Sequence, residues 1–423
     1  MKQNYTLPII VMILLFGMIS FVTNLASPMG DILRNQFTIP NWQGTLGVFA
    51  NFIAYAIMGV PAGNLLQRRG YKQTTLIAIA VGFVGVGIQL CSGWAGSFGI
   101  YLAGAFVAGF SMCLLNTVVN PMLNRLGGGG NRGNQLIQFG GTFNSLCGTA
   151  VIVVTGLLIP NITQARISDT FPLMYTALAV FALAFVVILL TKLPENEESR
   201  QAATAALPLR GLLQYRHIVL GAVAIFIYVG VEVGVPNVLN KWLQNPDSHF
   251  FAEGVSAEAV AGSVAAFYWL LMLVGRLVGG LVGSRVSARS MLTVVASVAI
   301  VLVVAAMLAP TSIMVRFPGF DGANGLAFNS IPLSAALLAS VGLCTSVMWG
   351  GIFNLAVEGL GRYTERASGL FMALVCGGGV LPLLMNVVVD VADYLPSYIV
   401  VVAGFAYLLY YALSGSKPKP VAE

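Results

Sequence analysis

The chain has 423 residues, of which 57% are hydrophobic and only 9% are charged, and its mean hydropathy is +0.87. Soluble domains carry about 25% charged residues, so this composition excludes a soluble globular protein and indicates an integral membrane protein. The net charge of +6 would fit a nucleic-acid partner, but the basic residues are distributed as membrane topology requires, and we expect no such partner.

Apolar stretches of about 20 residues, the length that a helix needs to cross ~30 Å of hydrocarbon, recur along the chain. They predict twelve transmembrane helices, over residues 7–28, 43–66, 73–94, 98–121, 134–160, 172–192, 216–240, 257–284, 288–309, 332–357, 366–390 and 393–414. A transmembrane β-barrel would instead show weakly alternating segments of about ten residues. The predicted fold class is therefore an all-α integral membrane protein.

The basic residues predict the orientation of these helices. Of the 21 lysine and arginine residues, Arg276 lies within an apolar stretch and four fall in the segments on one side, namely Arg34, Arg166, Lys241 and Arg316. The other sixteen fall in the segments on the opposite side, which also holds both ends of the chain. Because cytoplasmic loops carry the excess of Lys and Arg, we expect both termini in the cytoplasm.

The longest connection between predicted helices divides six helices from six. This predicts an N-terminal bundle over residues 1–192, a cytoplasmic linker over 193–215, a C-terminal bundle over 216–414 and a tail over 415–423. Local echoes between the halves, such as NTVVN at 116–120 and NLAVE at 354–358, indicate an internal repeat. Two repeated halves are the usual architecture of secondary transporters.

Two sets of stretches resemble a known family. The signature of the loop after helix two in the major facilitator superfamily, G-x-L-x-x-R-x-G-[RK]-[RK], is matched by Gly63, Leu65, Arg68, Gly70 and Lys72, with Tyr71 in place of the first basic residue. Within that superfamily the chain resembles the L-fucose:proton symporter family, which includes glucose/galactose permeases, at FVTNL (21–25), GTFNSLCG (141–148), YVGVEVGVPNVL (228–239) and FYWLLMLVGRLVG (267–279). The resemblance implies two pseudo-symmetric six-helix bundles, the major facilitator fold, in a functional monomer of a bacterial inner membrane.

Glu232 lies inside the apolar stretch 216–240. Charged residues within a membrane cost roughly 2.5–3.5 kcal/mol each on insertion scales, so they are functional candidates by default. The glucose/galactose-type members resemble this chain in carrying Glu here. We therefore expect Glu232 to bind substrate or a coupling cation, although neighbouring donors in a cavity wall could also satisfy it.

Asp31 is a second candidate for cation coupling. The fucose-type pattern in the first helix is N-x-x-D, and a gapless match places Asn24 and Ser27 at its two defining positions. Asp31 comes one helical turn after Ser27 and could share its face. It could equally be an interfacial residue beside Arg34.

Amide side chains are the predicted ligands of a neutral, hydroxylated solute, because each offers both donors and an acceptor. In helix four the fucose-type members have a Glu implicated in protonation where this chain has Asn116, so that proton relay is not carried over. The predicted substrate-binding residues are Asn24, Asn116, Asn120, Gln138, Asn144, Glu232, Asn237, Trp269 and Asn354. For the helix-four amides, hydrogen bonding between helices is the alternative, and for Trp269 it is packing.

Predicted gating residues lie near cytoplasmic helix ends: Arg68, Arg276, Glu358 and Arg362. Glu358 and Arg362 are spaced i,i+4, which suits an inner gating pair or a simple helix-end pair. Arg276 needs a carboxylate or carbonyl partner within the bilayer. The G-x-G-x-x-G match at Gly128, Gly130 and Gly133 follows a predicted helix rather than a strand, so it predicts a linker and not a dinucleotide site.

These residues predict a transporter that imports a neutral monosaccharide, such as glucose or galactose, by alternating access and with a proton or sodium ion as the coupling ion. A drug or other organic-solute antiporter of the same superfamily and an uncoupled sugar uniporter are the alternatives. An enzyme is not expected, because the chain has only two histidines and five cysteines without metal-type spacing. No metal site or organic cofactor is predicted.

Overall fold

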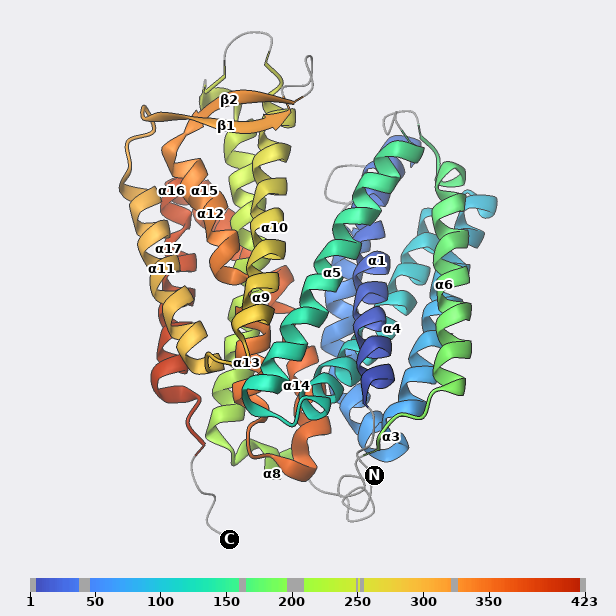
Figure 1. Cartoon of the computed structure of the whole chain (residues 1–423). Coiled ribbons are helices and arrows are strands. Elements are labelled where there is room, and N and C mark those ends of the chain that lie inside the picture. The colour runs from blue at the N-terminus through green and yellow to red at the C-terminus, as the bar shows by residue number, and fades with distance from the viewer. Residues whose placement is uncertain are drawn as a thin grey trace.

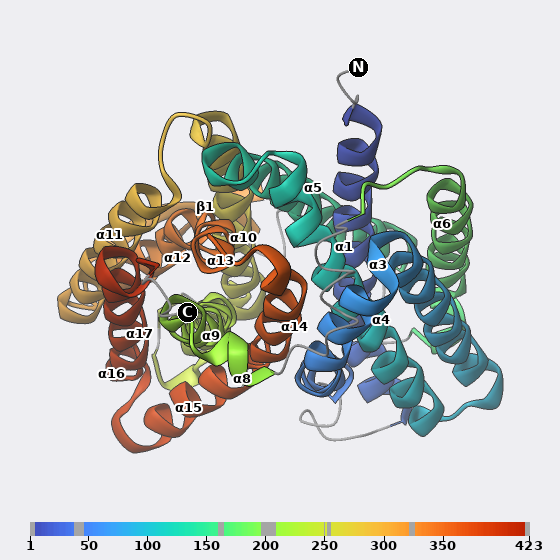
Figure 2. The same cartoon turned by 90° about the horizontal axis from the view of Figure 1, so that it is seen from below.

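The computed structural model describes residues 5–37, 46–159, 165–195, 209–248, 250–251, 255–320 and 326–418. Two helical bundles stand side by side (Figure 1), and both lie around a common boundary when seen from below (Figure 2). The N-terminal bundle consists of α1 (Thr6–Phe37), α3 (Leu46–Ala95), α4 (Phe98–Leu126), α5 (Gly130–Leu158), η1 (Ile167–Thr170) and α6 (Phe171–Leu190).

The C-terminal bundle is built from shorter helices. Its elements are α8 (Leu209–Leu213), α9 (Arg216–Gln244), η2 (Pro246–Ser248), α10 (Ala257–Val282), α11 (Ala288–Leu308), α12 (Leu333–Thr345), α13 (Met348–Val357), η3 (Gly361–Tyr363), α14 (Thr364–Leu374), α15 (Gly377–Ala392), α16 (Tyr394–Ser397), α17 (Ile399–Tyr410) and the π-helical turn η4 (Tyr411–Gly415). Helix α1 begins and η4 ends at the same end of the molecule, the bottom of Figure 1, which is called the inner end below.

Ten runs of the described residues are long and apolar enough to cross a membrane. One of them, α3, contains residues 46–66 of the predicted stretch 43–66 and all of 73–94, and α5 covers residues 134–158 of the predicted stretch 134–160 without being among the ten. The described helices thus account for all twelve predicted spans. The prediction of an all-α, twelve-span membrane fold is confirmed.

The turn between the two halves of α3 explains the matched loop signature. Gly70 has φ 78°, a conformation that residues with a Cβ rarely adopt. The backbone N–H groups of Tyr71 and Lys72 then donate to the carboxylate of Glu195, at 2.7 and 3.0 Å. A carboxylate at the start of a helix is stabilised by the free N–H groups there, so Glu195 fixes this turn.

Two predicted spans are interrupted near their middles. The tenth span breaks at Ser346 and Val347, between α12 and α13, and the eleventh at Val375 and Cys376, between α14 and α15. Gly377, the first residue of α15, lies so close to α9 that a Cβ there would be 2.0 Å from the carbonyl oxygen of Phe226. The eleventh span therefore breaks where its glycine run begins.

A β-hairpin is present that the sequence analysis did not predict. Strands β1 (Met314–Phe320) and β2 (Leu326–Pro332) pair antiparallel and lie across the outer end of the C-terminal bundle (Figure 1). The ring of Phe317 packs against Phe267 of α10, with centroids 4.8 Å apart. The hairpin lies between the predicted apolar stretches. The length that a helix needs to cross the membrane predicts nothing about the structure of such connecting segments.

Candidate functional site

Glu232 lies near the middle of α9, sixteen residues after the helix begins at Arg216. At a rise of 1.5 Å per residue this places it about 24 Å along the helix axis. The hydroxyl of Tyr228, one turn earlier on the same helix, donates to Oε1 of Glu232 at 2.8 Å. A carboxylate at this depth therefore has a donor from its own helix.

Arg276 of α10 is the second partner of Glu232. Its Nη2 atom donates to the same Oε1 atom at 3.1 Å, and both side chains are 13% exposed. The other carboxylate oxygen, Oε2, receives no hydrogen bond from the described residues, and the Glu232 side chain remains partly exposed. Glu232 thus keeps one accessible acceptor for a ligand or a proton.

Arg276 also joins the two bundles. Its Nη1 atom donates to the hydroxyl of Ser145 at 2.7 Å and to the carbonyl of Gly141 at 3.3 Å, both on α5 of the N-terminal bundle. A Cβ at Gly141 would stand 3.3 Å from Cδ of Arg276, so glycine leaves room for this approach. The partner predicted for Arg276 is present, but the residue lies beside Glu232 and not at the helix end with the other gating candidates.

A chain of amides and aromatic rings continues from Glu232 across the boundary between the bundles. Tyr228 lies 6.3 Å from the ring of Trp349, whose Nε1 donates to Oδ1 of Asn120 at 2.9 Å. Asn120 in turn donates to the carbonyl of Asn116, and Asn116 donates to the hydroxyl of Tyr55 at 2.7 Å. Asn116 and Asn120 therefore lie with Glu232 in one polar region between the bundles.

Three other predicted amides form bonds between helices. Gln138 of α5 donates to the carbonyl of Val347, which is freed by the break in the tenth span, at 2.9 Å. Asn354 of α13 donates to the carbonyl of Gly130 at 2.7 Å, and Asn144 donates to the carbonyl of Phe16 in α1 at 2.8 Å. Gln138 and Asn354 bind the two bundles together, whereas Asn144 holds two helices of one bundle.

The remaining candidates are placed apart from this cluster. Asn24 donates to the carbonyl and hydroxyl of Ser20 on its own helix. Asn237 is exposed, and Trp269 is 41% exposed with its ring against Tyr268. Asp31 and Ser27 belong to α1, but their side chains lie outside the described residues.

Further contacts at the inner end were missed by the sequence analysis. The hydroxyl of Tyr71 donates to Glu365 at 3.1 Å and Nε of Arg366 donates to Gln67 at 2.6 Å, each joining α3 to α14. We call these two pairs, with the Gln138–Val347, Trp349–Asn120 and Asn354–Gly130 pairs, the inner seam. Glu365 lies in the first turn of α14, one residue before the predicted apolar stretch 366–390. A charged residue just outside an apolar stretch is not distinctive, so the sequence did not mark Glu365 as a site residue.

The other gating candidates lie outside the inner seam. Arg68 is exposed, as are Glu358 and Arg362. Helix α13 ends at Val357, where the predicted span 332–357 also ends, and Gly359 follows with φ 74°. The one-turn spacing of a continuous helix is therefore absent, and the expectation of an i,i+4 helical pair is wrong.

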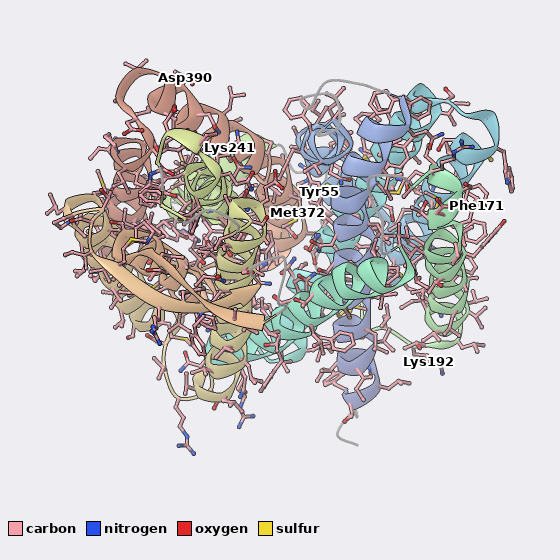
Figure 3. All side chains as sticks on the ribbon, turned by 90° about the horizontal axis from the view of Figure 1, so that it is seen from above. Tyr55, Phe171, Lys192, Lys241, Met372 and Asp390 are labelled. Carbon is pink, nitrogen blue, oxygen red and sulfur yellow. The ribbon has the colours of Figure 1, made fainter. Side chains whose placement is uncertain are left out.

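Glycines allow the closest approach at the inner seam. A Cβ at Gly59 of α3 would lie 2.3 Å from the backbone nitrogen of Ala373 in α14, and one at Gly63 would lie 3.0 Å from Cα of Gly369. In the view from above, Tyr55 and Met372 mark the place where these two helices meet (Figure 3). The bundles are thus in backbone contact along α3 and α14.

The relatives of the chain agree with this architecture. A glucose/galactose transporter of Brucella abortus is 29% identical, with 98% of this chain and 96% of the relative covered. A putative glucose/galactose transporter of Helicobacter pylori is 28% identical, with 98% of each chain covered. The L-fucose-proton symporter of Escherichia coli is 23% identical over 94% of this chain and 90% of its own.

Solved structures show the same fold. The transporter FucP, in the outward conformation, superposes with a TM-score of 0.80 at 21% identity and covers 98% of this chain and 99% of its own. The proton:xylose symporter XylE gives a TM-score of 0.67 at 14% identity, with 95% and 94% covered. A family model described as the Major Facilitator Superfamily matches residues 9–383. The chain is therefore a multi-pass membrane transporter, not an enzyme, and belongs to the Major Facilitator Superfamily.

Proposed function

We propose that the chain imports a neutral monosaccharide, of the glucose or galactose class, across a bacterial inner membrane by cation-coupled symport. The observation that carries this proposal is Glu232, a carboxylate with one accessible oxygen at the middle of α9, beside amide and aromatic side chains from both bundles. Sugar hydroxyls pair well with such mixed donors and acceptors. The names of the relatives support the same class of solute.

The polar region supports a neutral solute over a charged one. Among the described residues, the cation beside Glu232 is Arg276, which is already paired with it, so these two charges offset each other and do not favour a phosphate or a carboxylate. A drug antiporter would require a larger apolar cavity, whereas the described boundary is lined by Asn116, Asn120 and Tyr55. Sugar import is therefore the favoured function.

The coupling ion that fits Glu232 best is a proton. A sodium ion bound to this carboxylate would stand next to the guanidinium of Arg276, and two cations at close range repel each other strongly in a region of low dielectric. A proton neutralises Glu232 without adding a second cation at that position. We assign Glu232 as the coupling residue; the role of Asp31 is a separate question for mutagenesis.

The contacts of the inner seam indicate which conformation of the transport cycle the structure represents. The hydrogen bonds of the inner seam extend from the polar region to the inner end, so this conformation is the one that is closed to the cytoplasm, with the positive-inside rule placing the inner end there. Import requires these bonds to break while the bundles close at the outer end, as in alternating access by rocking of repeated halves. The chain functions as a monomer, because both walls of the polar region come from one chain.

The test is uptake of radiolabelled sugars into proteoliposomes with imposed gradients. We expect glucose or galactose to accumulate when a proton gradient is imposed, and not when only a sodium gradient is present. Accumulation that follows sodium alone would overturn the proton assignment. Uptake that merely equilibrates under every gradient would establish a uniporter, and uptake of no hexose would overturn the sugar assignment.

A further inference from the structure

A cavity of about 520 Å³ lies at the inner end, between the two bundles. Its walls come from the N-terminal bundle at Tyr71, Asn124, Arg125 and Gly128, and from the C-terminal bundle at Val357 and Thr364, among others. Pockets that bind small molecules in proteins have volumes of roughly 300–1,000 Å³. The cavity is therefore large enough for a small ligand.

The cavity continues the polar face of α4 that begins beside Glu232. Asn116, Asn120 and Asn124 follow at intervals of four residues, so they lie on one face of the helix. Asn116 and Asn120 bond Tyr55 and Trp349 in the polar region, and Asn124 lines the cavity. The eight residues from Asn116 to Asn124 correspond to about 12 Å of helix, so the cavity lies on the path that a solute takes from the middle of the membrane to the cytoplasm.

The amide of Asn124 is the polar group of α4 that reaches the cavity wall. Its Nδ2 atom is buried against Gly133 of α5 and makes no hydrogen bond to the described residues, whereas its Oδ1 atom lies toward Gly129 of the cavity wall. Gly128 has φ 77°, and a Cβ added to it would meet nothing within 4 Å, so this part of the wall is open. The cavity thus presents the amide oxygen of Asn124 as an acceptor beside free space.

The other polar groups indicate the chemistry of the ligand. The wall contains one cation, Arg125, and one buried anion, Glu365, which accepts from the hydroxyl of Tyr71. The opposite charges give no preference for an ion of either sign, whereas the amide, phenol and Thr364 hydroxyl suit a molecule with several hydroxyl groups. We propose that the cavity is a second binding site for the transported monosaccharide, occupied from the cytoplasm; this inference rests on the proposed function.

The position of the site implies regulation. The cavity is formed by both bundles in the conformation whose inner seam is closed, so a sugar bound there stabilises that conformation over one in which the bundles separate at the inner end. The carrier must pass through the separated conformation in order to release each sugar molecule. Sugar that has accumulated in the cytoplasm therefore slows further import.

The experiment uses right-side-out membrane vesicles that are preloaded with unlabelled glucose or galactose. Initial uptake of the labelled sugar is measured against the internal concentration, and each variant is normalised to its own uptake with a sugar-free interior. We expect inhibition in the wild type. Asn124→Leu should raise the internal concentration for half-inhibition by about tenfold, as expected when a ligand hydrogen bond of ordinary strength is lost.

Two further variants sharpen the experiment. Val357→Phe extends a larger apolar side chain into the cavity and should also relieve inhibition, so the test does not depend on the folding of Asn124→Leu alone. Asn131→Leu is the matched control, because Asn131 lies at the same end of the molecule but does not line the cavity. It should retain the wild-type inhibition.

Equilibrium dialysis of the purified protein gives an independent count of sites. We expect two equivalents of labelled sugar per wild-type chain, with the second site weakened about tenfold in Asn124→Leu and absent in Val357→Phe. One equivalent for the wild type, or inhibition by internal sugar that is unchanged in both variants, would overturn the second site while leaving the transport function intact. Failure of the wild type to transport either sugar would overturn the proposed function, and the second site with it.

Discussion

Arg276 and Glu232 form an ion pair of 3.1 Å between α10 and α9, and the same guanidinium group donates to α5 of the opposite bundle. Glu232, the carboxylate that we assign to coupling, is thus connected through Arg276 to the boundary between the bundles, which must open and close during transport. Its charge state and the stability of that boundary are linked through one side chain. The first two predictions follow from this arrangement.

Glu232→Gln should abolish accumulation of sugar against its gradient while exchange of labelled for unlabelled sugar persists. The amide keeps the shape of the side chain and can bond Tyr228, but it cannot bind and release a proton. The measurement compares gradient-driven uptake with counterflow in proteoliposomes. Glu258→Gln is the control, because Glu258 is exposed in the first turn of α10; unchanged accumulation in Glu232→Gln would refute the coupling role.

Arg276→Leu should destabilise the protein more than the double variant Glu232→Leu/Arg276→Leu. Removing one partner leaves a carboxylate with little hydration and no counter-charge, which costs about 3 kcal/mol when one partner of a buried ion pair is deleted. Removing both partners avoids this cost. Thermal unfolding of the four proteins of the cycle, in detergent, gives the coupling between the two residues; purely additive effects would contradict the ion pair.

Gly59→Val should disrupt the inner seam, because a Cβ at this position would lie 2.3 Å from the backbone of Ala373. Helix α3 must then move away from α14, which opens the inner end. Hydrogen exchange measured by mass spectrometry should become faster in peptides from α14. Gly87→Val provides a control on the same helix, since a Cβ at Gly87 meets nothing within 4 Å; equal exchange in the two variants would argue against the contact.

Trp349→Phe and Asn120→Ala should be coupled by about 1 kcal/mol in a double-mutant cycle of unfolding, the contribution of one ordinary hydrogen bond. The indole Nε1 of Trp349 donates to Asn120 at 2.9 Å; phenylalanine removes that donor together with part of the ring, and the double-mutant cycle separates the hydrogen bond from the loss of packing. Trp94→Phe combined with Asn120→Ala is the matched comparison, because Trp94 is 66% exposed and packs against Phe171. Coupling of equal size in both cycles would mean that the Trp349–Asn120 bond contributes nothing specific.

Much of the fold could be predicted from the sequence because a bilayer imposes a length on each apolar stretch. The helices of the structure cover all twelve predicted stretches, including α5, whose polar residues make it the least typical. The sequence did not predict the helix breaks at Ser346 and Val375 or the hairpin from Met314 to Pro332. Their backbone groups are satisfied by partners distant in sequence, as when Gln138 bonds the carbonyl of Val347.

The sequence by itself determined the membrane class, the number of spans and the presence of a carboxylate, Glu232, within one span, since each follows from the cost of placing polar groups in hydrocarbon. Only the tertiary structure decided what the polar residues do. It paired Arg276 with Glu232 and with Ser145, assigned Asn144 to a bond between two helices, and brought Tyr71 to Glu365 across the boundary. The partners in these pairs are 44 to 294 positions apart, and hydrogen bonds depend on the distance between atoms in space, which spacing along a helix does not specify.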